Sequence, residues 1–106
     1  MEVRRDVFQA IADPTRRTIL SLVMLQAMTP GAIAENFNST RQTISKHIQI
    51  LQECDLVTQK QVGREIYYHL NSKKMKEVTD WLAPFTKMWD DRFNKLETIM
   101  KKYKRK

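Results

Sequence analysis

The sequence predicts a mainly α-helical fold with one small β-hairpin. Residues 38–54 combine an apolar side and a polar side at helical spacing. Residues 57–70 change to the two-residue period of paired strands, and residues 72–100 return to helical spacing over a longer stretch. Helices, then a hairpin, then a long helix is the order of a winged helix-turn-helix, with the long C-terminal helix used for dimerisation.

Length and charge set the first limits. The 106 residues suit a single domain, residues 1–106, whose small core draws on 42% hydrophobic residues. A formal charge of +7, from 19 Lys+Arg and 12 Asp+Glu, favours nucleic acid or an acidic surface as the partner. Much of this charge belongs to a C-terminal tail that either contacts phosphates or is solvated: Lys101, Lys102, Lys104, Arg105 and Lys106.

Cysteine usage and hydropathy predict a cytoplasmic protein. Cys54 is the single cysteine, so we expect no internal disulfide, no thiolate-rich zinc site and a reducing compartment. The segment before Pro14 contains acidic residues and lacks the apolar centre of a signal peptide, and no apolar run reaches membrane-spanning length. Cys54 itself is interpreted either as a small buried side chain or as a redox switch.

Two helices are predicted at the N-terminus. The first, about residues 3–12, has apolar residues repeated at three- and four-residue steps, namely Val3, Val7, Phe8 and Ile11. Asp13 then caps a second helix, and Pro14 stands at a position that has no hydrogen bond to lose. Arg16 and Arg17 are expected on the outside of this helix. Its buried face is expected to hold Ile19, Leu20, Leu22, Val23, Met24 and Leu25.

The helix-turn-helix is predicted at about residues 29–54. Thr29-Pro30 repeats the pattern of a cap followed by proline and opens a short third helix, residues 31–37. Ser39, followed three residues later by Gln42, predicts a capping box at the start of the fourth helix. A capping box would fold the Gln42 amide back onto the backbone, and this would compete with a contact from that amide to a base.

The outward side of the fourth helix is predicted to read the major groove of double-stranded DNA. This side holds amide, ammonium and hydroxyl groups, with no carboxylate before Glu53. Gln can pair with an adenine edge, Lys with guanine or phosphate, and Ser or Thr with either. The alternative is an ordinary solvated helix face, which has a similar composition. The predicted DNA-contacting residues are Ser39, Thr40, Arg41, Gln42, Thr43, Ser45, Lys46, His47 and Gln49.

A two-stranded wing is predicted at about residues 57–70. Gly63-Arg64 suits a two-residue connection between the strands, because Gly takes the positive φ that such turns need. Lys60 and Arg64 lie near the tip, where they either contact DNA or protect the strand edge from pairing with another chain. The second strand alternates, with Ile66, Tyr68 and Leu70 on one side and Tyr67 and His69 on the other.

The last helix, about residues 72–100, carries more apolar surface than one small domain covers. A second copy of the chain is the expected cover, so we predict a homodimer paired through the first helix and this one. The rival interpretation is a winged-helix module that docks another protein on the same aromatic stripe. The predicted dimer-interface residues are Val3, Val7, Phe8, Trp81, Phe85, Met88, Trp89, Phe93 and Leu96.

The chain resembles the ArsR-type winged-helix transcriptional repressors of bacteria over most of its length. The resemblance is carried by residues 8–20 (FQAIADPTRRTIL), 44–57 (ISKHIQILQECDLV) and 63–70 (GREIYYHL). Residues 81–96 (WLAPFTKMWDDRFNKL) are similar to the C-terminal helix of a subgroup without obvious metal ligands. The resemblance implies a symmetric homodimer, paired through its first and last helices, that binds an inverted-repeat operator and represses transcription.

The same resemblance bears on metals and effectors. Metal-responsive relatives carry a Cys-x-Cys pair whose matching positions here are Thr29 and Gly31, and neither residue is a useful soft-metal ligand. A second family site uses His and carboxylate ligands on the last helix, yet no His follows His69. We therefore expect no metal and no cofactor, and the sequence does not indicate whether a small-molecule effector exists. No phosphate loop, nucleophile elbow or paired His–carboxylate motif is present, so an enzyme is not expected.

Overall fold

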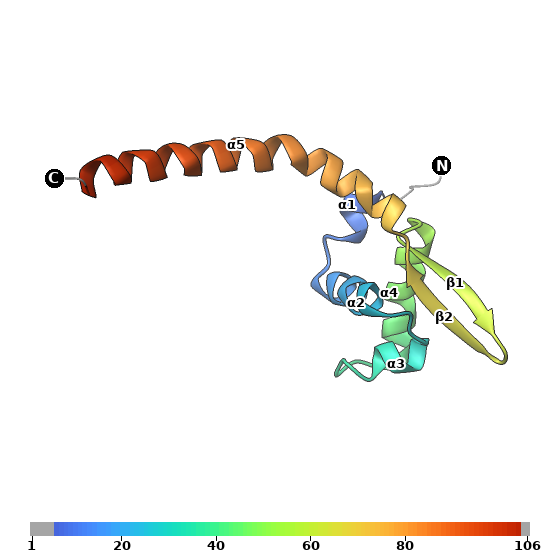
Figure 1. The fold of residues 1–106 in the computed structure, drawn as a ribbon. Helices are drawn as coiled ribbons and strands as arrows, with labels where there is room; N and C mark the ends of the chain where they lie inside the picture. Colours follow the sequence, from blue (N-terminus) through green and yellow to red (C-terminus); the bar gives the residue numbers. More distant parts are fainter. Residues whose placement is uncertain (1–5, 105–106) are drawn as a thin grey trace. The chain divides into compact units, whose positions relative to one another are not determined.

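The computed structural model describes residues 6–104 and confirms a mainly α-helical fold with a two-stranded hairpin. Contacts divide the chain into two compact units, with the boundary between Lys76 and Glu77 inside the last helix. The first unit contains the helix-turn-helix and the hairpin. The elements in order are α1 (Val7–Ala10), α2 (Pro14–Leu25), α3 (Pro30–Ala34), α4 (Arg41–Glu53), β1 (Val57–Val62), β2 (Glu65–Leu70) and α5 (Ser72–Lys104) (Figure 1).

The first helix is shorter than the predicted 3–12. A capping box fixes its start: the Gln9 N–H donates to the Asp6 carboxylate at 2.8 Å, and the Asp6 N–H donates to the Gln9 side chain at 3.0 Å. The helix ends at Ala10, and Val3 lies outside the described residues. Only one turn of helix therefore precedes α2 in the described chain.

The cap of α2 is confirmed as predicted. Asp13 has extended backbone, as expected before a proline, and its carboxylate accepts from the Arg16 N–H at 3.0 Å. The predicted burial of the last turn of α2 is wrong, since Met24 is 63% exposed and Leu25 is 78% exposed. The apolar face of α2 that packs into the core ends at Val23, because the next two positions turn away from it.

The start of α4 differs from the prediction by one residue. Thr40, and not Ser39, is the capping residue, and its hydroxyl accepts from the Thr43 N–H at 3.2 Å. Two adjacent hydroxyl residues can each cap a helix, and the backbone of Thr40 has the extended conformation that a cap needs. Gln42 is consequently not placed to close a capping box with Ser39, and the competition predicted for its amide is removed.

The hairpin forms with the predicted connection. Antiparallel β1 and β2 pair from Val57 opposite Leu70 to Val62 opposite Glu65. Gly63 has φ +64, the left-handed conformation that glycine takes without strain. A second left-handed residue, Asp55 with φ 60, ends α4 and turns the chain into β1.

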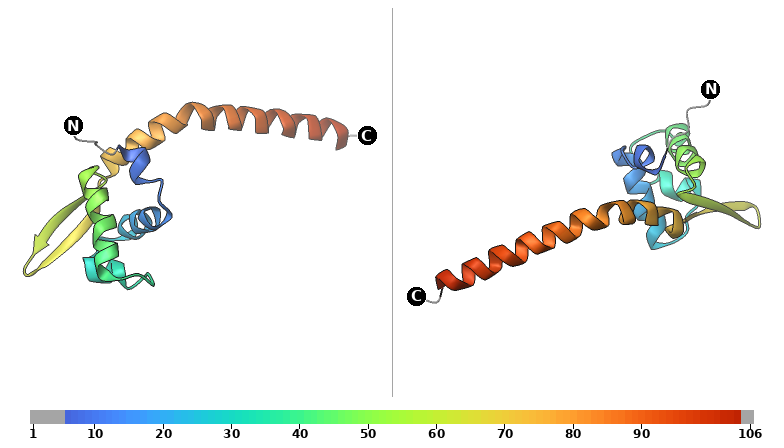
Figure 2. Two further views of the ribbon diagram at one scale, coloured as in Figure 1. Left: turned by 180° about the vertical axis from the view of Figure 1, so that it is seen from behind. Right: turned by 90° about the horizontal axis from the view of Figure 1, so that it is seen from above.

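The core of the first unit forms around α4, which lies between α2 and the hairpin in Figure 1 and in the left view of Figure 2. Helix α4 also contacts α3. Cys54 is among the buried residues, directly after α4. The buried apolar side chains of this unit are Val7, Ala10, Ile19, Leu20, Val23, Ile33, Ile44, Ile48, Leu51, Cys54, Leu56 and Val57.

Hydrogen bonds fix the hairpin to the helical part of the first unit. The Tyr68 N–H donates to the Met28 carbonyl at 2.8 Å and the Met28 N–H donates to the Tyr68 carbonyl at 3.1 Å. At the other end of β2, the Asn71 N–H donates to the Leu56 carbonyl and its side chain donates to the Asp55 carbonyl, both at 2.8 Å. The position of the hairpin relative to α4 is therefore fixed by backbone contacts as well as by packing.

Helix α5 continues through Pro84 to Lys104 and exposes a long apolar stripe. The rings of Trp81 and Phe85 contact each other, with centroids 5.0 Å apart and planes inclined by 45°. Within residues 6–104, none of the helices has an apolar stretch of the length that a bilayer crossing needs, long as α5 is. The exposed apolar residues of α5 are Trp81, Leu82, Phe85, Met88, Trp89, Phe93, Leu96, Ile99, Met100 and Tyr103.

Candidate nucleic-acid interface

Helix α4 has the two faces that the sequence predicts. Ile44, Ile48 and Leu51 are buried, at the three- and four-residue steps of one helix face. The opposite face is exposed and, before Glu53, carries no acidic side chain. Its exposed polar residues are Arg41, Gln42, Thr43, Ser45, Lys46 and Gln49, and Ser39 and Thr40 are exposed in the turn before it.

The first turn of α4 is held by its cap and by contact with α3. The hydroxyls of Thr40 and Thr43 share a hydrogen bond of 2.9 Å, so both contribute to the helix end. The Arg41 guanidinium lies against α3 at Gly31, where an added Cβ would stand 3.0 Å from an Arg41 nitrogen. No structural role was expected for Gly31, and the structure shows that its missing side chain leaves the space that Arg41 occupies.

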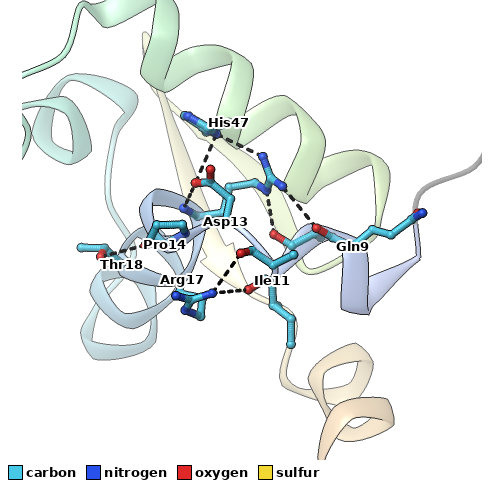
Figure 3. A network of polar contacts seen from close by, with 10 residues as sticks. Gln9, Ile11, Asp13, Pro14, Arg17, Thr18 and His47 are labelled. Carbon is cyan, nitrogen blue, oxygen red and sulfur yellow. Dashed lines mark hydrogen bonds and ion pairs between the residues drawn. The ribbon is translucent and has the colours of Figure 1, made fainter.

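His47 lies apart from the outward face. Its side chain is 21% exposed, and its Nδ1 atom lies 3.3 Å from Nη1 of Arg16 and 3.8 Å from the Asp13 carboxylate (Figure 3). Both partners belong to the start of α2. The prediction that Arg16 lies outside is therefore wrong, because its side chain is half-buried between α2 and α4. The structure places His47 against α2 and does not group it with Lys46 and Gln42.

The pKa of Asp13 is lowered from its ordinary value of 3.8. Burial alone would raise this pKa, but the N–H of Arg16, the electrostatic interactions with His47 and Arg16, and the N–H of Thr15 together outweigh burial. Because the folded-state pKa is the lower one, the stabilisation is fully present above the ordinary value and is lost as pH falls through the folded value. The carboxylate is therefore charged beside His47 at neutral pH.

The wing presents basic residues at its exposed end. Lys60 lies on β1 opposite Tyr67, and Arg64 follows Gly63 in the turn; both basic side chains are exposed. Glu65 also stands here, where its carboxylate accepts from the Tyr67 hydroxyl at 3.0 Å. This hydrogen bond and the charge of Glu65 raise the pKa of Tyr67. The Tyr67 hydroxyl thus stays protonated and donates to Glu65, two residues before it on the same side of β2.

The predicted dimer-interface residues fall into two groups. Val7 is 2% exposed in the single chain, so it belongs to the core and has almost no surface to offer a partner. Phe8, the next residue, is exposed at 38% and does offer surface to a partner. The remaining predicted residues that the structure describes all belong to the exposed stripe of α5: Trp81, Phe85, Met88, Trp89, Phe93 and Leu96.

Metal ligands do not gather in the described part of the chain. Within residues 6–104, no group of three or more His, Cys, Asp or Glu side chains is placed to hold an ion. Thr29 uses its hydroxyl to cap α3, accepting from the Ala32 N–H at 3.2 Å. At the two positions that match the family's Cys-x-Cys pair, Thr29 therefore caps α3 and Gly31 leaves space for the Arg41 guanidinium.

Comparison with known proteins gives a consistent picture. Residues 11–60 match the model of a helix-turn-helix domain family. The transcriptional repressor SdpR of Bacillus subtilis (strain 168) is 40% identical over 86 residues, which is 81% of this chain and 96% of that protein. The HTH-type transcriptional regulator CmtR of Mycobacterium tuberculosis (strain ATCC 25618 / H37Rv) is 37% identical over 62 residues, which is 58% of this chain and 52% of that protein.

A solved structure extends the likeness to the hairpin. The ArsR-like transcriptional regulator from Rhodococcus sp. RHA1 matches with a TM-score of 0.67 and 32% sequence identity, and the match covers 88% of each chain. Such coverage includes more than the helix-turn-helix, so the likeness is one of the winged-helix fold and of its sequence together.

Proposed function

The chain belongs to the ArsR-type family of winged helix-turn-helix transcription regulators, and on that premise we propose that it represses transcription as a homodimer bound to an inverted-repeat operator. Members of this family bind double-stranded DNA and are not enzymes. In the proposed complex α4 is the recognition helix and the hairpin is the wing. The two recognition helices of a dimer would enter successive major grooves about one helical turn apart.

The exposed face of α4 is the observation that carries the proposal. It brings Gln42, Ser45, Lys46 and Gln49 to one side of a helix whose other side is packed into the core. These side chains offer donors to the acceptor-rich edges of bases and to phosphates, and no carboxylate lies among them to repel DNA. Gln42 and Lys46 stand four residues apart, so both can reach the same groove.

The wing and the turn would add contacts to the DNA backbone. Arg64 stands in the hairpin turn and Lys60 on the adjoining strand, and both are exposed. A cation at the end of a hairpin can reach the phosphates or the minor groove beside the major groove that α4 enters. We assign contacts with the DNA backbone also to Ser39, Thr40 and Arg41, which stand at the N-terminal end of α4.

Loss of a base-reading side chain should change sequence preference. Replacing Lys46 or Gln42 with Ala should cost about 1–3 kcal/mol on the preferred duplex and much less on random DNA, as expected for direct contacts to base edges. Titration of labelled duplexes by fluorescence anisotropy measures both affinities. Thermal melting is the control, since neither exposed side chain caps α4 and both variants should melt within a few degrees of the unsubstituted protein. Equal losses on every duplex would refute the base-reading role.

Loss of a phosphate contact should have the opposite pattern. Arg64→Ala should weaken binding to all duplexes alike and reduce the slope of log affinity against log salt by about one unit. Arg64→Lys retains the charge and is the matched control, so it should retain most of the slope. A change in the selected sequence, without a change in salt dependence, would mean that Arg64 reads bases.

The proposed repressor does not sense metal through the family's cysteine positions. The roles of Thr29 as a cap of α3 and of Gly31 beneath Arg41 support this, because both positions serve the helix-turn-helix itself. A protein-docking module remains the rival function, favoured by the exposed stripe of α5. A monomeric mass in solution, together with no sequence preference on DNA, would favour that rival.

A further inference from the structure

One arginine connects the end of α1 with α4 (Figure 3). The Arg16 guanidinium donates from Nε to the Ala10 carbonyl at 2.6 Å and from Nη2 to the Gln9 carbonyl at 3.2 Å. Its remaining nitrogen, Nη1, lies 3.3 Å from Nδ1 of His47. A single side chain on α2 thus contacts the last turn of α1 and the middle of the recognition helix.

The chemistry of the two side chains sets the direction of this contact. A guanidinium has donors and no acceptor, so in a hydrogen bond between the two side chains Arg16 donates and Nδ1 of His47 accepts. The carboxylate of Asp13 stands 3.8 Å from the same Nδ1 atom and also accepts from the Arg16 N–H. The start of α2 therefore surrounds this edge of the imidazole with one donor and one negative charge.

A directional hydrogen bond resists a rotation of α4 about its axis, which the apolar contacts of α4 do not. Helix α4 is held in the core by the burial of Ile44, Ile48 and Leu51. The stabilisation from burial is proportional to the buried area, and this area changes little when the helix rotates slightly about its axis. A hydrogen bond weakens steeply when its donor–hydrogen–acceptor angle departs from linearity, so the contact from Arg16 to His47 resists such a rotation. His47 directly follows Lys46 in the chain, and the same rotation would move the Lys46 side chain relative to a base.

We propose that Arg16 and His47 are positioning residues for DNA recognition: their contact fixes the rotation of α4 relative to α1 and α2, and with it the direction of Gln42 and Lys46. This inference rests on the proposed DNA-binding function and replaces the base contact expected of His47 from the sequence. It assigns no contact with DNA to Arg16.

The neighbouring arginine is a matched control. The Arg17 guanidinium also donates to backbone carbonyls before α2, to Ile11 at 2.9 Å and to Ala12 at 3.1 Å, but its contacts do not include α4 (Figure 3). Arg16→Ala and Arg17→Ala remove the same charge and similar hydrogen bonds to the same segment. The difference between the two variants isolates the contact with the recognition helix.

The test measures the affinity of each variant for the preferred duplex and for a random one. Arg16→Ala should bind the preferred duplex about tenfold more weakly than Arg17→Ala does, the size expected for a lost hydrogen bond to a charged group, while the two should bind random DNA equally. Equal binding of the preferred duplex by both variants would overturn the inference. If the unsubstituted protein itself shows no preference among duplexes, the proposed function fails first.

Substitution of His47 gives a second readout that does not depend on the stability of Arg16→Ala. Asn places an oxygen acceptor close to where Nδ1 stands, whereas Gln places its amide close to where Nε2 stands. His47→Asn should therefore retain the affinity and the sequence preference, and His47→Gln should lose about as much preference as Arg16→Ala. The reverse result, with Gln restoring binding and Asn failing, would show that His47 contacts DNA directly and would overturn the positioning role.

Discussion

Trp89→Glu should convert the protein from a dimer to a monomer and abolish tight operator binding. Trp89 is 69% exposed in the single chain and stands in the middle of the apolar stripe of α5. If a second copy covers this stripe, the substitution removes an aromatic anchor and places a carboxylate in an apolar contact. Loss of a central anchor costs about 2 kcal/mol or more, so self-association should weaken by about thirtyfold at least.

Operator affinity should fall with the dimer, because a monomer engages one half-site only and loses the gain in effective concentration from the second. Analytical ultracentrifugation gives the mass, and anisotropy gives the affinity. Asn94→Glu is the matched control: it adds the same charge to the same helix on the side away from the stripe, and the dimer should survive it. A Trp89→Glu protein that remains dimeric would contradict dimerisation through α5.

Leu51→Ala should destabilise the first unit by about 2–5 kcal/mol, the cost of a cavity at a fully buried leucine. Leu51 is 0% exposed and belongs to the face of α4 that packs into the core. A loss of this size is a large part of the stability of a small domain. Chemical denaturation followed by circular dichroism measures the free energy of unfolding.

The exposed side of the same helix supplies the control for Leu51. Gln49→Ala should change the free energy of unfolding by less than about 0.5 kcal/mol, since its side chain is exposed and lies off the buried face. Leu51→Ala should still select the same DNA sequence at temperatures where it remains folded. An equal stability loss in both variants would mean that the two faces of α4 are assigned wrongly.

Local signals in the sequence predicted most of the fold. The pairs Asp13-Pro14 and Thr29-Pro30 are caps as expected, because a cap and a proline act within three residues of one another. Gly63 takes the positive φ expected of it, and the two-residue connection is confirmed. The change from helical to strand period at β1 is likewise a property of neighbouring residues.

The features that the sequence did not predict are of two kinds. One is a choice between neighbouring residues of similar chemistry, and the other is a contact between residues that are far apart in the chain. Ser39 and Thr40 have the same capping chemistry, and only the backbone of the folded protein selects Thr40. The contact between Arg16 and His47 joins residues that are 31 positions apart, and no periodicity marks it. Arg16 has the charge and position of a solvated surface residue, so a sequence pattern places it outside.

For the residues expected to contact DNA, the sequence predicted the exposed face of α4 better than the exposure of each side chain. Their helix and its exposed face follow from periodicity, and the structure leaves all but His47 of the predicted residues on α4 exposed. The half-burial of His47 depends on where α2 starts relative to α4, which periodicity within α4 cannot indicate. The sequence therefore predicted the exposed face of α4 and did not predict the half-burial of His47.

Selection of bound sequences from a pool of random duplexes tests the central claim most directly. The dimeric repressor proposed here should enrich an inverted repeat whose two half-sites are centred about one helical turn apart, since two α4 helices would read successive major grooves on one face of the duplex. Lys46→Ala, selected in parallel, should enrich a less defined half-site. Recovery of unrelated sequences by the unsubstituted protein, at a salt concentration where it remains folded, would contradict sequence-specific recognition by α4.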